Sequence, residues 1–126
     1  MAKTSSATAD KVADYGVALD RSSELDGYTV NFVTITKSHD LRPMLAALPG
    51  GNCSCPHWGY VVKGRMIVRY PDREETIEAG DAFYMPPGHV PSAETGSEFV
   101  IISPAEEMAA TDAAIAASMQ AQGQAH

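Results

Sequence analysis

Four residues of types that bind metal ions occur in two short segments of the sequence. Cys53, Cys55 and His57 alternate with other residues, and His89 follows a Pro-Pro-Gly turn farther along the chain. Side chains alternate between the two faces of a strand, so the first three would point the same way in an extended segment. Pro56 could break this alternation, because proline within a strand usually marks an edge or a bulge. The spacing predicts a metal site formed by Cys53, Cys55, His57 and His89.

The donor set indicates which ion such a site would take. Two thiolates and two imidazoles are typical of zinc, which prefers tetrahedral nitrogen and sulfur coordination. Sulfur donors disfavour magnesium, calcium and manganese, whereas iron and copper remain compatible. Four protein ligands would close the site and give it a structural role, while three would leave a position for water or substrate and allow hydrolytic or Lewis-acid chemistry. The sequence leaves both arrangements open.

The thiols and imidazoles also have other interpretations. Free cysteine is among the most buried residue types, so Cys53 and Cys55 could be inert members of the core. A disulfide between residues i and i+2 of a strand would be strained. A redox or nucleophilic role would need a lowered thiol pKa, which His57 or His89 could provide. Either histidine could instead be structural.

The elements that must position these residues are short strands separated by turns. β-Branched and aromatic residues are frequent in each predicted strand, and Gly, Pro or Asp residues lie in most of the connections. The predicted strands cover residues 28–36, 60–62, 66–70, 74–78, 82–85 and 98–103. Strands of this length and spacing are typical of an antiparallel sandwich or barrel, so the predicted fold class is all-β. One or two helical turns beginning at Asp40 are expected before the cysteines.

The two ends of the chain have different patterns. Residues 1–27 are weakly patterned, and a short helix over residues 7–15 within a loosely attached arm is expected. At the other end, Ser103-Pro104-Ala105-Glu106 has the spacing of a helix capping box. The predicted organisation is therefore an N-terminal arm (1–27), a β-barrel (28–103) and a C-terminal helix and tail (104–126).

The C-terminal segment is rich in alanine, which favours a helix. Met108, Ile115 and Met119 would fall on one face of that helix. Apolar residues at helical spacing usually belong to the core, so this face is expected to pack on the barrel or on a partner subunit.

Composition and charge exclude several classes of function. The 126 residues suffice for one domain. Sixteen acidic against nine basic residues give a net charge of −7, which disfavours binding to nucleic acid or to anionic membrane surfaces. No apolar run approaches the roughly 20 residues of a membrane-spanning helix, and the first residues do not have the pattern of a secretory signal. A cytoplasmic, reducing location is expected.

Residues 51–91 resemble the two motifs of the cupin superfamily. Gly80, five further residues and then Pro86-Pro87-Gly88 are similar to the second motif, G-x5-P-x-G. The stretch from Trp58 to Gly64, which reads WGYVVKG, is similar to the end of the first motif. Fifteen residues (65–79) separate the two motifs, close to the shortest spacing of bacterial single-domain cupins. The resemblance implies a cupin-type antiparallel β-barrel, or jelly roll, with a C-terminal α-helix.

This sequence departs from the metal ligands of the cupin pattern. In the family the ligands are the two histidines of an H-x-H pair, a glutamate in the same motif, and a third histidine after P-x-G. The corresponding positions here hold Gly51, Cys53, His57 and Pro91, and His89 lies two residues before Pro91. The iron or manganese chemistry usual in the family therefore does not transfer to this chain.

Two functions are predicted from these residues. The first is a small cupin-domain protein that binds a metal ion, with Zn²⁺ favoured over Fe or Cu, beside a pocket for a small molecule, its reaction unassigned. The alternative is a non-catalytic ligand-binding or sensing cupin whose Cys/His site is purely structural. A homodimer is expected from the resemblance, and Trp58 and Tyr60, opposite His57 on a strand, would lie in the core or in the dimer interface.

Overall fold

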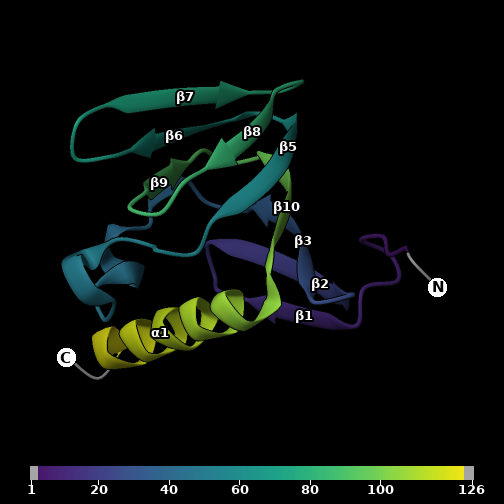
Figure 1. Cartoon of the computed structure of the whole chain (residues 1–126), viewed down its shortest axis with the longest axis horizontal. Coiled ribbons are helices and arrows are strands. Elements are labelled where there is room, and N and C mark those ends of the chain that lie inside the picture. The colour runs from purple at the N-terminus through teal and green to yellow at the C-terminus, as the bar shows by residue number, and fades with distance from the viewer. Residues whose placement is uncertain (1–2, 124–126) are drawn as a thin grey trace.

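The computed structural model describes residues 3–123, with side chains up to Gln120, so the ends of the predicted arm and tail lie outside it. Within residues 3–123 two antiparallel sheets face each other, and one long helix packs at their lower edge in the view of Figure 1. The larger sheet has the order β1 (Lys11–Asp14), β2 (Ala18–Leu25), β3 (Tyr28–Ile35), β10 (Glu98–Pro104), β5 (His57–Lys63), β8 (Ala82–Met85). The smaller has the order β4 (His39–Asp40), β9 (Val90–Ala93), β6 (Arg65–Arg69), β7 (Glu74–Glu78). The all-β, jelly-roll prediction is confirmed.

The main core lies between the sheets because inward positions alternate with outward ones along the strands. In β5, His57 and Val61 are buried, whereas Trp58, Tyr60 and Val62 face outward. The buried apolar side chains come from both sheets: Ala18, Ile35, Val61, Met66, Val68, Met85, Ala93 and Phe99.

A second apolar cluster closes one end of the space between the sheets. Leu45, Cys53 and Cys55 form its centre. Helix α1 (Ala105–Gly123) packs Met108 and Ile115 against it, as the sequence pattern predicts. The short 3₁₀ helices η1 (Arg42–Leu45) and η2 (Pro49–Gly51) lie beside α1, where the Ala47 amide donates to Ser118 Oγ at 3.1 Å.

Residues 11–25 differ from the sequence prediction. They form β1 and β2 in the larger sheet, so the expectation of a short helix over 7–15 in a loose arm is wrong. β2 pairs with β3 along eight residues, from Ala18 with Ile35 to Leu25 with Tyr28. Its sequence, ALDRSSEL, has weak strand propensity, and pairing with the β-branched β3 decides its conformation. The domain boundaries at 27/28 and 103/104 remain predictions.

The start of the C-terminal helix also differs from the prediction. Ser103 and Pro104 lie in β10, and α1 begins at Ala105, whose amide donates to Gly27 O at 2.9 Å. Ser103 therefore does not cap the helix, and its hydroxyl points instead to His57. The helical turn expected after Asp40 is η1, and Asp40 Oδ1 accepts the Arg42 amide at 2.7 Å.

No helix among the described residues combines the length and the apolar character that crossing a membrane requires.

Two glycines at turns provide a test of this packing. Gly64 and Gly16 both have left-handed backbone angles, with φ of 77° and 80°. A Cβ at Gly64 would overlap Ser97, whose buried hydroxyl accepts the Arg65 amide, whereas a Cβ at Gly16 meets no atom within 4 Å. Gly16→Ala should therefore cost about 1 kcal/mol of unfolding free energy from backbone strain, and Gly64→Ala about 1–3 kcal/mol more from overpacking. Urea unfolding of both variants measures the difference, and equal losses would contradict this packing.

Candidate metal centre and pocket

A backbone bridge between two distant segments brings the candidate ligands together. Cys53 pairs with His89 in an isolated antiparallel bridge. The Cys53 amide donates to His89 O at 3.0 Å, and the Gly88 amide donates to Cys53 O at 2.8 Å. Gly88 can make this turn because its φ of 99° is readily adopted by glycine alone. His57, the first residue of β5, lies alongside.

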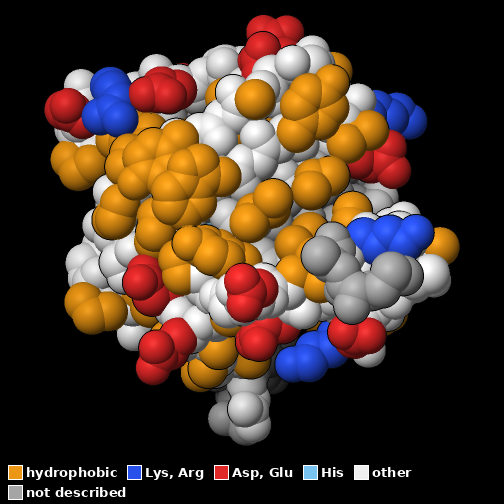
Figure 2. Space-filling model, turned by 45° about the vertical axis from the view of Figure 1, so that its right-hand side comes forward, with side chains coloured by type: hydrophobic (Ala, Val, Ile, Leu, Met, Phe, Trp, Pro, Cys, Tyr) orange, Lys and Arg blue, Asp and Glu red, His pale blue; other side chains and the backbone are white. Residues whose placement is uncertain are grey.

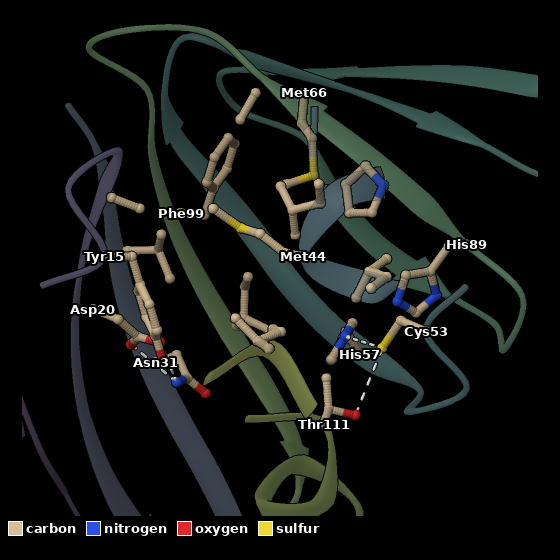
Figure 3. Close-up of a pocket in the computed structure, with 18 of the residues that line it drawn as sticks. Tyr15, Asp20, Asn31, Met44, Cys53, His57, Met66, His89, Phe99 and Thr111 are labelled. Atoms are coloured by element: carbon tan, nitrogen blue, oxygen red, sulfur yellow. Dashed lines mark hydrogen bonds between the residues drawn. The ribbon is translucent and has the colours of Figure 1, made fainter. Parts of the chain in front are cut away.

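The structure collects three of the four predicted ligands. Cys53, His57 and His89 are buried, and their ligand atoms all lie within 4.8 Å of one another. His57 Nε2 is 3.7 Å from Cys53 Sγ, and the two imidazole centroids are 4.8 Å apart. Figure 3 shows the three side chains converging at one side of the pocket. One sulfur and two nitrogens at this separation are positioned to bind one ion.

Each of the two imidazoles is oriented by a hydrogen bond at its Nδ1. His89 Nδ1 lies 2.7 Å from Pro86 O, and because a carbonyl only accepts, Nδ1 carries the proton and Nε2 a lone pair. That Nε2 is buried and has no hydrogen-bond partner among the described residues. His57 Nδ1 lies 2.6 Å from Ser103 Oγ, which leaves its Nε2 toward Cys53. Ring nitrogens held in this way are the usual arrangement of metal-binding histidines, so the residues fit a bound ion.

Burial sets the protonation states of the three groups. It lowers the pKa of His57 to about 3, with help from His89 nearby, and it lowers the pKa of His89. Burial raises the pKa of the Cys53 thiol, although contacts to the Cys55 backbone and Thr111 partly oppose the rise. At neutral pH the centre therefore presents two uncharged imidazoles and one thiol, and the thiol must lose a proton to bind a metal.

Cys55 lies outside this group. Its Sγ is 3.6 Å from Pro56 O, and the chain between Cys53 and His57 is irregular rather than a strand. Pro56 thus breaks the alternation that would have aligned both thiols. Burial and the neighbouring Cys53 raise the pKa of Cys55 to about 12. Since both thiol pKa values are raised, the structure opposes a thiolate nucleophile or redox pair.

The sequence did not predict a role for two further residues at the Cys/His cluster, Ser103 and Thr111. Ser103 has the pattern of a helix cap, and no signal in the sequence indicates that it orients His57. Thr111 lies on α1 with its Oγ1 3.8 Å from Cys53 Sγ. It is buried at a helical position between Met108 and Ile115, and a polar residue on the buried face of a predicted helix is the signal that could have identified it.

The centre forms part of the wall of a cavity of about 130 Å³ between the sheets and α1. Apolar side chains such as Val33, Ile35 and Phe99 line most of it. Figure 3 shows Cys53, His57 and His89 on one side, and Tyr15, Asp20 and Asn31 on the other. A small molecule in this cavity would contact both groups.

Comparisons with known proteins agree with this architecture. A model of the family described as "AraC-like ligand binding domain" matches residues 57–110, from β5 into α1. No curated protein matches the sequence significantly.

Several solved structures are similar in fold. A structural-genomics protein of unknown function from Rhizobium leguminosarum has a TM-score of 0.60 at 21% identity, with 82% of this chain and 95% of that chain covered. An RmlC-like cupin from Shewanella frigidimarina has a TM-score of 0.53 at 19% identity, covering 75% and 83%. An HTH_3 family transcriptional regulator from Vibrio cholerae has a TM-score of 0.51 at 13% identity, covering 70% and 51%. With two sheets in jelly-roll order around a buried Cys/His cluster, the chain has the cupin fold that its motifs predict.

Proposed function

We propose that this protein is a small cupin that binds one metal ion through Cys53, His57 and His89, at the wall of a pocket for a small molecule. The observation that carries the proposal is His89 Nε2, a buried acceptor that has no partner among the described residues and lies beside the Cys53 thiol and His57. A buried polar atom left unsatisfied costs about 1–3 kcal/mol, and a metal ion would remove that cost.

Zn²⁺ is the ion that this donor set fits best, because it prefers nitrogen and sulfur ligands, with Fe and Cu as alternatives. Three protein ligands leave a coordination position open to the cavity, so the bound ion would supply Lewis-acid polarisation of a ligand there. The chain's own residues orient the site: Ser103 holds His57, and Pro86 O holds His89. Cys55 as a fourth ligand, which would close the site, remains a prediction.

A non-catalytic ligand-binding or sensing cupin is the second candidate. The match of residues 57–110 to an AraC-like ligand binding domain favours it, since the matched region includes β5 and β9, which flank the cavity. In this function the metal would stabilise the barrel and the cavity would hold an effector.

The cytoplasmic location expected from the sequence also remains a prediction.

The metal site can be tested by elemental analysis of dialysed protein. We expect about one zinc ion per chain in the wild type and a loss of more than about tenfold in affinity in Cys53→Ser and His57→Ala, because each variant removes one of three donors.

Cys55→Ser provides the matched control. It removes a buried thiol two residues away whose Sγ lies outside the cluster, so it should retain the metal. Loss of metal in Cys55→Ser would indicate a closed four-ligand site and favour the structural alternative. Wild-type protein that stays metal-free after incubation with zinc would contradict the proposal.

Metal binding should also release protons in a defined number. The two imidazoles are uncharged at pH 7 because burial lowers their pKa, whereas the pKa of the Cys53 thiol is raised above its ordinary 9.0. We therefore expect about one proton released per zinc ion, and an affinity that rises about tenfold per pH unit between about pH 6 and 8. Calorimetry in buffers of different ionisation enthalpy counts the protons. A release of two or more would show that Cys55 or a charged imidazole takes part.

We also propose that the protein forms a homodimer through the outer face of the larger sheet. Trp58, Tyr60 and Val62 of β5, Tyr84 of β8 and Ile102 of β10 are exposed there, and Trp58 aligns with both Tyr84 and Ile102 in neighbouring strands. Figure 2 shows hydrophobic side chains gathered on the side of the molecule where this sheet comes forward. Contiguous exposed aromatic residues are typical of protein interfaces.

Substitution of one central residue should separate the subunits. Trp58→Arg places a charge in the middle of the proposed interface, and we expect light scattering to give a monomer mass where the wild type gives a dimer. Val12→Arg is the control, because Val12 is also an exposed apolar residue but lies on β1, at the far edge of the same sheet. A wild-type monomer at high concentration would contradict the dimer.

A further inference from the structure

The cavity has a second polar group of residues, distinct from the Cys/His cluster. Asp20 on β2, Asn31 on β3, Asp112 on α1 and Tyr15, in the β1–β2 connection, all line the cavity. Figure 3 shows Tyr15, Asp20 and Asn31 across the cavity from Cys53, His57 and His89. We refer to these four residues as the acidic end of the pocket.

Asn31 is the most informative member of the acidic end. Its side chain is buried, with 2% of its surface exposed. Its Nδ2 donates to both Asp20 carboxylate oxygens, at 3.0 and 3.1 Å, which fixes the orientation of the amide. Its Oδ1 then has no hydrogen-bond partner among the described residues, although it is buried. A buried acceptor of this kind needs a donor, and the ionised carboxylates of Asp20 and Asp112 can only accept.

Charge is the second informative feature of the acidic end. Within residues 3–123, neither Asp20 nor Asp112 forms an ion pair. Burial and Asp20 together raise the pKa of Asp112 to about 6, and Lys11 partly opposes this rise. Burial likewise raises the pKa of Asp20, and burial with both carboxylates raises that of Tyr15 to about 12. Burial therefore makes a negative charge costly on both carboxyl groups, and no ion pair among the described residues offsets that cost.

We propose that the ligand of this pocket carries a protonated amine, which binds between the Asp20 and Asp112 carboxylates and donates to Asn31 Oδ1. An ammonium group supplies a positive charge for the two carboxylates and a hydrogen-bond donor for Asn31 Oδ1. The Tyr15 ring can add a cation–π contact. This proposal rests on the pocket of the proposed function and extends it by naming the class of ligand, but it does not depend on the metal.

The cavity limits the size of such a ligand. Its volume of about 130 Å³ is comparable to an engineered cavity of about 150 Å³ that accepts benzene. The walls between the two polar groups are apolar, formed by residues such as Val33, Ile35 and Ile101. The ligand class is therefore a primary amine with a short alkyl chain or a single ring, whose far end approaches the Cys/His centre.

Binding of two small amines to the full chain tests the proposal. Benzylamine and n-butylamine are titrated into metal-depleted protein and followed by nitrogen-edited NMR, with benzyl alcohol as the neutral isostere. We expect at least one amine to bind, to shift the Asn31 side-chain amide signals, and to bind about tenfold or more tightly than the alcohol. Asp112→Asn and Asp20→Asn should each weaken amine binding about tenfold, whereas Asp72→Asn, in an exposed turn, should not.

Each opposite result overturns the proposal. Equal affinity for benzyl alcohol and benzylamine would exclude recognition of charge, and unchanged affinity in both acidic-end variants would place the amine elsewhere. Failure of both amines to bind would exclude the ligand class. Amine binding is measured in metal-depleted protein and zinc loading by elemental analysis, so a failed metal site and a failed amine site give different results. The NMR spectra of the free variants show whether each one is folded.

Discussion

The pairing of Cys53 with His89 is the constraint on which the site depends. Two backbone hydrogen bonds join a turn before β5 to the turn before β9, and they bring a thiol and an imidazole from distant parts of the sequence into contact. His57 follows as the first residue of β5, held by Ser103 from the neighbouring strand β10. The Cys/His cluster thus comes from the way the two sheets are joined, and the local C-x-C-x-H spacing contributes less to it.

Helix α1 completes both ends of the pocket. It packs Met108 and Ile115 on the cluster of Leu45, Cys53 and Cys55. One turn of the same helix provides Thr111 beside Cys53 and Asp112 at the acidic end. A shift of the helix would therefore change the solvation of both polar groups at once.

The sequence predicted the barrel because its strands carry clear turns and because Gly64, Gly80 and Gly88 lie where the motifs require them. It also predicted Cys53, His57 and His89, since their side-chain chemistry is visible without geometry. It could not decide Cys55, because the outcome depends on how the backbone passes Pro56. The prediction that Ser103 caps the helix was wrong. Its hydroxyl could bond either the start of the helix or a neighbouring strand, and because β10 extends to Pro104, the hydroxyl lies beside His57.

The acidic end was harder to predict, although it has one signal. Asn31 interrupts the apolar strand YTVNFVTI at an inward position, and a buried amide in such a strand requires a partner. In the sequence, Asp20 and Asp112 have the pattern of ordinary surface residues. Their flanking residues do not indicate that β2 and α1 place them at the cavity. Their burial opposes stability, because it raises the pKa of both carboxyl groups. Residues that weaken the fold in this way, arranged across an apolar cavity from a Cys/His cluster, are best explained by a ligand that compensates them.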